Sequence, residues 1–422
     1  MKIETKCLQS GYEPANGEPR VMPIVQSTTY KYSSTQELGD LFDLKASGYF
    51  YTRLANPTAG YVEDKITDLE GGVGTMLTSS GQSATLMAIT NICEAGDHII
   101  SSAALYGGTF NLFSVTFKKL GIDVTFVDAN ISEEDLAKEI KPNTKLIFGE
   151  SLSNPALIVL DIEKFAKVAH ENKLPLFIDN TFPTPYLLNP IKYGADIVIH
   201  STSKYMDGHA VALGGAIVDS GNFDWTSSDR FKCLTTPDPS YHGVIYTETF
   251  GASAFIIKAR VQLMRDLGCA PAPMNCFLLN LGLETLHLRM ERHSENALKV
   301  AEFLANNDKI EWVNYPKLQT SSEYNLAQKY LPKGSSGVIS FGPKGGKEAA
   351  AKLMDNLNLI KIVCHVSDVR TSVLHPASST HRQLSDSQLV ESGIKPELIR
   401  LSVGIENIDD ILEDLKQAIE LI

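Results

Sequence analysis

The sequence is poor in positive charge and in paired cysteines. Its 38 Lys and Arg residues against 50 Asp and Glu residues give a net charge of −12, which disfavours nucleic acid and acidic lipid surfaces as partners. The six cysteines include no CxxC pair, so we expect neither a disulfide framework nor a zinc ribbon, and no metal. Unpaired cysteines are expected to be reduced thiols, which favours a cytoplasmic protein. The charged Glu4 stands where a signal peptide needs apolar residues, so export is not expected.

Long apolar runs and the common nucleotide-binding motifs are also missing. Ser, Thr, Gln and Asn interrupt the uncharged stretch 71–93, so it is not expected to span a membrane. No GxGxxG follows a predicted strand, and residues 345–347 (GGK) precede Glu348 rather than the Ser or Thr of a P-loop. With 422 residues, 43% of them hydrophobic, the chain is nevertheless long enough for two or three packed domains.

The chain divides into three segments by pattern. Residues 1–60 lack a sustained period, which predicts an N-terminal arm that contributes to a neighbouring subunit. In residues 61–255, short β-rich runs alternate with helical lengths, which predicts a mostly parallel sheet with helices on both faces. Residues 256–422 combine helical patterns, two later strands and an amphipathic final helix. The expected fold class is therefore α/β with a smaller C-terminal α+β domain.

Polar residues follow several of the predicted strands, where parallel α/β folds bind their ligands. Residues 78–85 (TSSGQSAT) follow one strand and open a helix, whose amide groups could bind a phosphate, although an ordinary capped helix is equally compatible. Asp179 ends an apolar run, and Lys204 follows another through a Ser-rich loop. Either residue alone would be explained as a cap or a solvated charge, but their common position favours a site.

Pyridoxal 5′-phosphate would use all of these groups. This cofactor needs a lysine amine for covalent attachment, a carboxylate for its ring nitrogen, an anion-binding site and a flat side chain over the ring. Tyr106 could cover the ring, although a core or loop aromatic would leave the same signal.

The chain also resembles, nearly from end to end, the Cys/Met-metabolism family of pyridoxal-phosphate enzymes. The resemblance rests on short stretches in a fixed order, namely 51–58 (YTRLANPT), 79–84 (SSGQSA), 179–182 (DNTF), 200–205 (HSTSKY), 237–243 (PDPSYHG), 375–378 (HPAS) and 400–406 (RLSVGIE). It implies the aspartate-aminotransferase-like fold of pyridoxal-phosphate-dependent transferases, fold type I.

The resemblance implies roles for residues at the reacting centre. Lys204 would bind the cofactor and move protons, Asp179 would pair with the ring nitrogen, and Tyr106 would stack on the ring. The substrate would be bound by Arg400, Asn154 and His365, with Asn154 also near the phenolic oxygen of the cofactor. A planar guanidinium such as that of Arg400 suits a carboxylate.

The resemblance also implies a phosphate site shared between subunits. One chain would contribute Gly81, Gln82, Ser201 and Ser203. Tyr51 and Arg53 would come from the neighbouring chain. The expected assembly is therefore a homo-oligomer, a dimer of dimers with shared active sites.

The implied reaction is a γ-replacement in which sulfide, or methanethiol as an alternative thiol, displaces acetate from O-acetylhomoserine. The same residues would serve a γ-lyase acting on methionine or homocysteine, or a cystathionine γ-synthase. Gly108 stands where methionine γ-lyases of the family carry Cys, which counts against a lyase. A pyridoxal-phosphate-binding partner protein without turnover is a remote alternative, motivated by residues 364–370.

Three positions depart from the family pattern. Relatives tend to carry Asn or Ser where His365 stands and Gly where Ser367 stands, so substrate choice near the carboxylate pocket stays open. Ser203 replaces a usual Thr and keeps the hydroxyl group.

Overall fold

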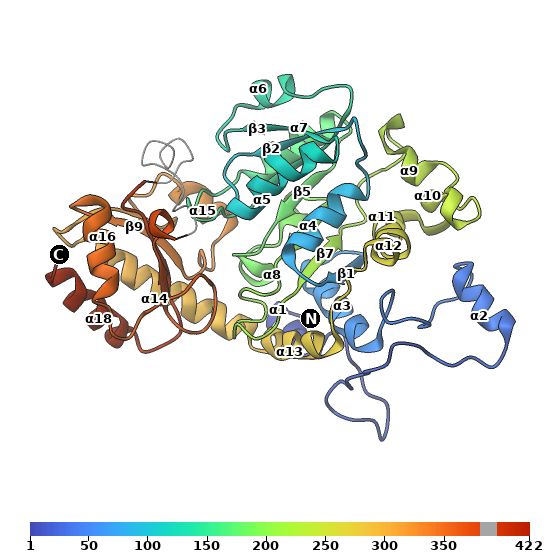
Figure 1. Cartoon of the computed structure of the whole chain (residues 1–422), viewed down its shortest axis with the longest axis horizontal. Helices are drawn as coiled ribbons and strands as arrows, with labels where there is room; N and C mark the ends of the chain where they lie inside the picture. The colour runs from blue at the N-terminus through green and yellow to red at the C-terminus, as the bar shows by residue number, and fades with distance from the viewer. Residues whose placement is uncertain (380–394) are drawn as a thin grey trace.

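Two β-sheets organise the protein, as Figure 1 shows for the computed structural model, which describes residues 1–379 and 395–422. A larger body contains the seven-stranded sheet, and the C-terminal body, orange to red in the figure, contains the five-stranded sheet. The long helix α14 (Leu286–Ala305) runs between the two bodies. Within the described ranges, no helix is long and apolar enough to cross a membrane.

The large sheet has the strand order β1-β7-β6-β5-β4-β2-β3. All neighbouring pairs are parallel except those of β7, which runs antiparallel to β1 and to β6. The strands are β1 (Gly74–Thr78), β2 (His98–Ser102), β3 (Asp123–Val127), β4 (Thr144–Glu150), β5 (Leu176–Asp179), β6 (Ile197–His200) and β7 (Gly215–Asp219). The predicted fold class is confirmed, although the sequence analysis did not identify β7.

Alternate residues of these strands pack on opposite faces of the sheet, because side chains alternate along a strand. Ile178 and Val198 join a core that includes residues of α3 (Pro57–Glu70) and α7 (Ile162–Glu171). Phe177 and Ile199 join a second core, which includes residues of α4 (Gly81–Thr90) and α11 (Ala254–Lys258). The sheet is thus buried on both faces, which explains why its central strands are almost continuously apolar.

Shorter helices complete the larger body. They are α1 (Ile3–Gln9), α2 (Thr35–Phe42), α5 (Gly107–Asn111), α6 (Glu133–Lys138), α8 (Thr184–Leu187), α9 (Lys232–Thr235), α10 (Tyr246–Phe250), α12 (Arg265–Leu267) and α13 (Pro273–Glu284). Phe255, Val261 and Met264 pack into the core of the large sheet. The predicted domain boundaries at residues 60 and 255 stay a prediction.

The small sheet has the order β10-β11-β12-β9-β8. Its strands are β8 (Ile310–Asn314), β9 (Val338–Pro343), β10 (Lys361–Ile362), β11 (Ser372–Leu374) and β12 (Ile399–Ser402). Three helices pack against it through Val300 of α14, Leu353 of α16 (Gly346–Asp355) and Leu415 of α18 (Ile408–Glu420), and α15 (Tyr324–Tyr330) precedes β9. The amphipathic pattern at the C-terminal end correctly predicts α18.

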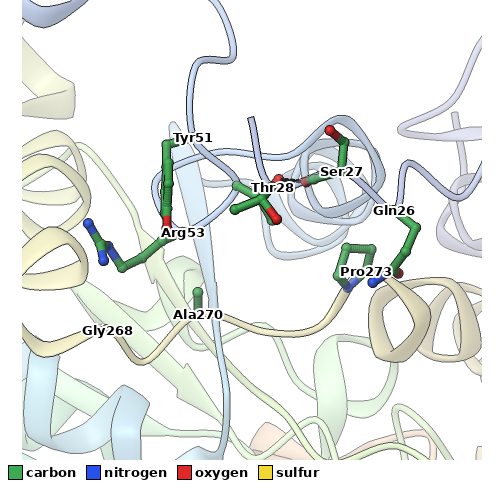
Figure 2. A pocket seen from close by; sticks show the side chains of 9 residues that line it. Gln26, Ser27, Thr28, Tyr51, Arg53, Gly268, Ala270 and Pro273 are labelled. Carbon is green, nitrogen blue, oxygen red and sulfur yellow. Dashed lines mark hydrogen bonds between the residues drawn. The ribbon is translucent and has the colours of Figure 1, made fainter. Parts of the chain in front are cut away.

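The N-terminal arm lies along the outside of the larger body. Helix α1 contacts α3, α13 and α14, whereas α2 projects away from the rest of the chain (Figure 1). Tyr51 and Arg53 line an open hollow of about 340 Å³ (Figure 2). The Arg53 guanidinium lies 4.9 Å from the centre of the Tyr51 ring. The other lining residues are Gln26, Ser27, Thr28, Thr52, Gly268, Ala270 and Pro273.

Candidate active site

The carboxyl ends of three neighbouring strands bring acidic and basic side chains together. Asp179 is the last residue of β5 and is paired in register with Glu150, the last residue of β4. Asp179 also pairs with Ile199 of β6, and Lys204 lies in the turns that follow this strand. Parallel strands end at one edge, so the structure places Asp179 and Lys204 at the same edge of the sheet.

Lys204 occupies an environment that disfavours its charged form. Burial, and next the charge of Arg400, lower the pKa of its amine from 10.5 to about 8. The amine is therefore closer to neutrality than that of an ordinary lysine, so it can release and take up a proton more readily near neutral pH.

Asp179 is a partly buried carboxylate without a cationic protein partner among the residues that the structure describes. Its Oδ1 accepts hydrogen bonds from the Thr181 amide (3.0 Å) and hydroxyl (2.5 Å). Burial raises the pKa of Asp179 above its ordinary value. A protonated ring nitrogen would supply the missing positive charge, so this position fits pyridoxal 5′-phosphate.

Glu150 is a site residue that the sequence analysis did not identify. Its Oε1 accepts a hydrogen bond from the Tyr106 amide at 2.6 Å, and its Oε2 accepts one from the Asn154 amide at 3.3 Å. Burial and the neighbouring Asp179 raise the pKa of Glu150 well above its ordinary value. The sequence signal that could have identified Glu150 is the same as for Asp179, namely an acidic residue at the end of an apolar strand.

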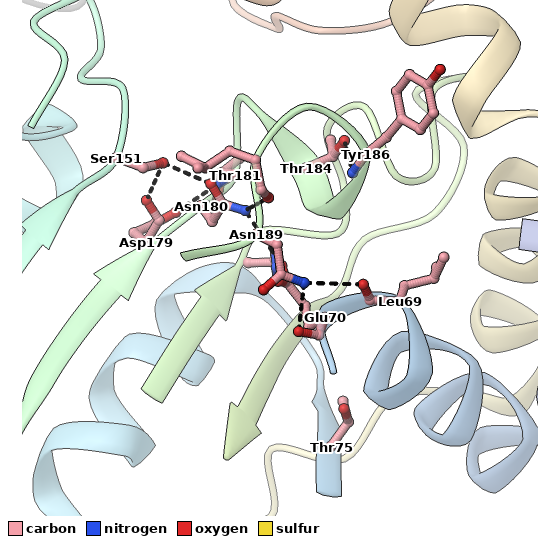
Figure 3. A network of polar contacts seen from close by, with 12 residues as sticks. Leu69, Glu70, Thr75, Ser151, Asp179, Asn180, Thr181, Thr184, Tyr186 and Asn189 are labelled. Atoms are coloured by element: carbon pink, nitrogen blue, oxygen red, sulfur yellow. Dashed lines mark hydrogen bonds and ion pairs between the residues drawn. The ribbon is translucent and has the colours of Figure 1, made fainter. Parts of the chain in front are cut away.

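A buried polar network connects the ends of these strands (Figure 3). Glu70, the last residue of α3, accepts a hydrogen bond from Asn180 Nδ2 (3.3 Å) and lies 2.7 Å from His200 Nε2. Ser151 donates its hydroxyl to Asn180 Oδ1 at 2.8 Å and its amide to the Asp179 carbonyl at 2.9 Å. The network joins the ends of β4, β5 and β6, which holds the Asp179 backbone in place.

The start of α4 can bind an anion. The Ser80 side chain caps the Ser83 amide, which leaves the amides of Gly81 and Gln82 without an acceptor within the helix. A Cβ atom at Gly81 would lie 2.6 Å from the Cβ atom of Ser201, so only glycine fits between the helix start and the loop before Lys204. The described geometry fits a phosphate at this helix start.

Ser201 and Ser203 differ in how their hydroxyl groups are used. Ser203 Oγ donates to the Gly214 carbonyl (3.1 Å) and accepts from the Gly214 amide (2.9 Å), so its proton is directed at Gly214. The described residues provide no hydrogen-bond acceptor for the Ser201 hydroxyl, and that residue lies against Gly81. Ser201 is thus the better placed of the two to donate to a phosphate, and the assignment of Ser203 stays a prediction.

Tyr106 lies next to the helix start that can bind an anion. It precedes α5, and its side chain is 50% exposed. A Cβ atom at Gly108 would collide with the Tyr106 ring and would lie 2.7 Å from Gln82 Nε2. A glycine at this position therefore lets the ring, α5 and the start of α4 approach one another, and a larger residue would displace the Tyr106 ring.

Arg400 is a buried cation whose hydrogen-bond partners among the described residues are all neutral. Its Nη1 donates to Asn154 Oδ1 at 3.4 Å, and its Nη2 donates to the carbonyls of Cys364 (3.4 Å) and His365 (3.3 Å). The side chain of Glu406 instead accepts hydrogen bonds from Thr371. A buried guanidinium without a carboxylate is costly, so the position fits a carboxylate-bearing ligand.

No polar contact joins Tyr51 or Arg53 to the phosphate-binding residues of the same chain in the part that the structure describes. Within residues 1–379 and 395–422, Arg53 makes no ion pair or hydrogen bond with the residues around Gly81 and Ser201. Both side chains instead line the hollow of Figure 2, which is open to solvent.

The backbone of Ser367 explains why glycine would fit at this position. Its φ of +74° lies in the left-handed region, its side chain is buried, and its Oγ has no partner among the described residues.

We expect Ser367→Gly to raise the free energy of unfolding by about 1 kcal/mol, because strain and an unsatisfied hydroxyl are both removed. Urea unfolding would measure this, and Ser372→Gly in β11 should instead lower stability. A destabilised Ser367→Gly variant would contradict the strain argument.

A lysine amine, a carboxylate and a helix start with free amide groups lie at one edge of a parallel sheet, which is the set of groups that a pyridoxal-phosphate-dependent enzyme of fold type I requires. A structure from Campylobacter jejuni, described as a putative O-acetylhomoserine (thiol)-lyase, superimposes with a TM-score of 0.96 at 40% identity over 100% of both chains. That protein carries N′-pyridoxyl-lysine-5′-monophosphate.

Sequence comparison gives the same result. The family model for Cys/Met metabolism PLP-dependent enzymes matches residues 4–420. The O-acetyl-L-homoserine sulfhydrylase of Leptospira meyeri is 48% identical over 99% of this chain and 97% of its own, and the homocysteine synthase of Schizosaccharomyces pombe is 46% identical over 99% and 98%. The chain belongs to the Cys/Met metabolism family of PLP-dependent enzymes, and its cofactor is pyridoxal 5′-phosphate.

Proposed function

We propose that this enzyme catalyses a γ-replacement in which O-acetylhomoserine and sulfide give homocysteine and acetate. The full-length similarity to proteins named O-acetyl-L-homoserine sulfhydrylase and homocysteine synthase carries this proposal. The site supports it, because Lys204 and Arg400 both contact His365: the Lys204 amine lies 3.4 Å from His365 Nδ1, and Arg400 Nη2 donates to the His365 carbonyl at 3.3 Å. An amino acid bound through its carboxylate by Arg400 would present its carbon atoms to Lys204.

We assign the steps to this chain's residues. Bound pyridoxal 5′-phosphate supplies the electron sink that makes the substrate Cα proton acidic. Lys204 Nζ removes that proton and then one from Cβ, which a flexible side chain can reach in turn. Tyr106 assists the departure of acetate from Cγ, the sulfide sulfur then bonds to Cγ, and the two protons return to Cβ and Cα to give homocysteine. Asp179 pairs with the ring nitrogen, and Asn154 orients the substrate beside Arg400.

We also propose that the active site is completed by a second copy of the chain. The helix start at Gly81 and Gln82 offers backbone donors but no cation, whereas a phosphate dianion in a crevice needs one. Arg53 supplies this cation from the neighbouring chain, with Tyr51 beside it, in a two-fold dimer that pairs into a tetramer. The six cysteines are free, which supports a cytoplasmic location.

A product assay tests the proposed reaction. Purified enzyme with O-acetylhomoserine and sulfide should form homocysteine and acetate in equal amounts. Methionine alone should give little α-ketobutyrate, and cysteine should replace sulfide poorly as the thiol. Dominant α-ketobutyrate formation would identify a γ-lyase, dominant cystathionine formation would identify a cystathionine-forming enzyme, and no turnover of any substrate would favour a non-catalytic role.

The grip on the substrate carboxylate can be tested at Arg400. Lysine keeps the charge but loses the two-point hydrogen bonding of the guanidinium, so Arg400→Lys should raise the Michaelis constant for O-acetylhomoserine at least about tenfold. The affinity for pyridoxal 5′-phosphate, measured by fluorescence titration, should change far less. An unchanged Michaelis constant would show that Arg400 has only a structural role.

A further inference from the structure

The Lys204 side chain has one hydrogen-bond partner in the part of the chain that the structure describes. Its Nζ lies 3.4 Å from Nδ1 of His365, and no carboxylate of residues 1–379 or 395–422 lies within ion-pair distance of it. The two residues are 161 positions apart, and His365 belongs to the segment between β10 and β11 of the small sheet. The His365 carbonyl accepts a hydrogen bond from Arg400, which fixes the backbone that carries the imidazole ring.

The imidazole of His365 is neutral in this position. Burial, and next the positive charge of Lys204, lower the pKa of His365 from 6.5 to about 4, although Asp368 and Asp207 act in the opposite direction. A neutral imidazole carries one N–H group and one lone pair. Because Nδ1 faces an amine that donates hydrogen bonds, the lone pair belongs on Nδ1 and the proton on Nε2.

His365 Nε2 is buried and has no partner among the described residues. Asp207, which follows Lys204 by three positions, has a buried Oδ1 atom that also lacks a described partner, and its negative charge acts on His365. A negative charge near the ring favours a proton on the imidazole, and the amine that faces Nδ1 assigns this proton to Nε2.

We propose that His365 is a positioning residue for Lys204, whose ε-amino group donates a hydrogen bond to Nδ1 whenever it is free. The role of this hydrogen bond in catalysis rests on the proposed function. When Lys204 takes a proton from the substrate, it becomes an ammonium group beside the Arg400 cation. The neutral acceptor stabilises this ammonium group and holds it in the site. The proton stays on Lys204, because the pKa of His365 lies far below that of the lysine.

The test measures Lys204 itself, without substrate or turnover. The full-length protein, freed of cofactor, is treated with trace acetic anhydride at a series of pH values, and acetylation of the Lys204 peptide is quantified by mass spectrometry. The wild-type midpoint should lie near the expected pKa of about 8. His365→Leu removes the acceptor and should lower this midpoint by about one pH unit. His365→Asn should stay within about 0.3 of wild type, because its amide oxygen is attached to Cγ as Nδ1 is.

Two controls keep the result specific. His365→Met is a second apolar variant should His365→Leu fold poorly, and thermal melting checks both. The exposed Lys299, paired with Glu295, should keep one midpoint in every variant. An unchanged Lys204 midpoint in the apolar variants would overturn the proposal. An equal decrease of the Lys204 midpoint in His365→Asn would also overturn it, because this variant keeps a hydrogen-bond acceptor and loses only the imidazole ring. A lowered midpoint in an enzyme that forms no homocysteine would contradict only the proposed function.

Discussion

Arg53→Ala and Lys204→Ala subunits, mixed and reassociated, should regain activity that neither variant has alone. Lys204→Ala should lose at least about a thousandfold in turnover, because it removes both the cofactor attachment and the base. Arg53→Ala should lose cofactor affinity at the partner's site. If sites are shared, each mixed dimer contains one intact site. With random pairing, about a quarter of wild-type activity should return in an assay of homocysteine formation.

Subunit exchange must be verified in the same samples, and native mass spectrometry of size-tagged chains would do so. Each variant dissociated and reassociated by itself is the matched control and should stay inactive. Verified mixed dimers without activity would mean that Arg53 serves the site of its own chain, and the shared-site proposal would fail.

Asp179→Asn should keep the cofactor bound and lose most turnover, by about a hundredfold or more. An amide cannot hold the ring nitrogen protonated, and each 1.4 kcal/mol of lost stabilisation costs a factor of ten in rate. The absorbance of the bound cofactor and the rate of homocysteine formation would separate the two effects.

Asp219→Asn is a suitable comparison for this variant. Asp219 is a buried aspartate at the end of β7, where burial raises its pKa to about 7, and it accepts hydrogen bonds from the Gly221 amide and from the Ile256 amide of α11. This variant should change stability more than turnover. Near-normal turnover in Asp179→Asn would contradict the role proposed for Asp179.

Much of the fold could be predicted because its signals are local. The central strands are apolar and short, and Asp179 and Lys204 follow two of them directly, so their common edge follows from parallel topology alone. The strand β7 was missed, since Gly215–Asp219 is a short run between glycines without a clear period. Its antiparallel direction depends on pairing with β1 and β6, which no local pattern encodes.

The parts of the site that escaped prediction depend on contacts between distant residues. Glu70 and His200 are 130 positions apart, and Glu150 contacts the amide of Tyr106 across 44 positions. The orientation of the Ser203 hydroxyl toward Gly214 depends on a turn that composition does not reveal. The strain at Ser367 is a backbone property that only the resemblance to glycine-bearing relatives suggested.

Reduction with borohydride tests the central claim most directly, namely that the cofactor is held at the sheet edge by Lys204. The purified enzyme should be yellow, and the reduced protein should carry one pyridoxyl phosphate group per chain. Peptide mapping should place this group on Lys204 and on no other lysine. A pyridoxyl group on a different lysine, or none at all in a protein shown to contain the cofactor, would contradict the account.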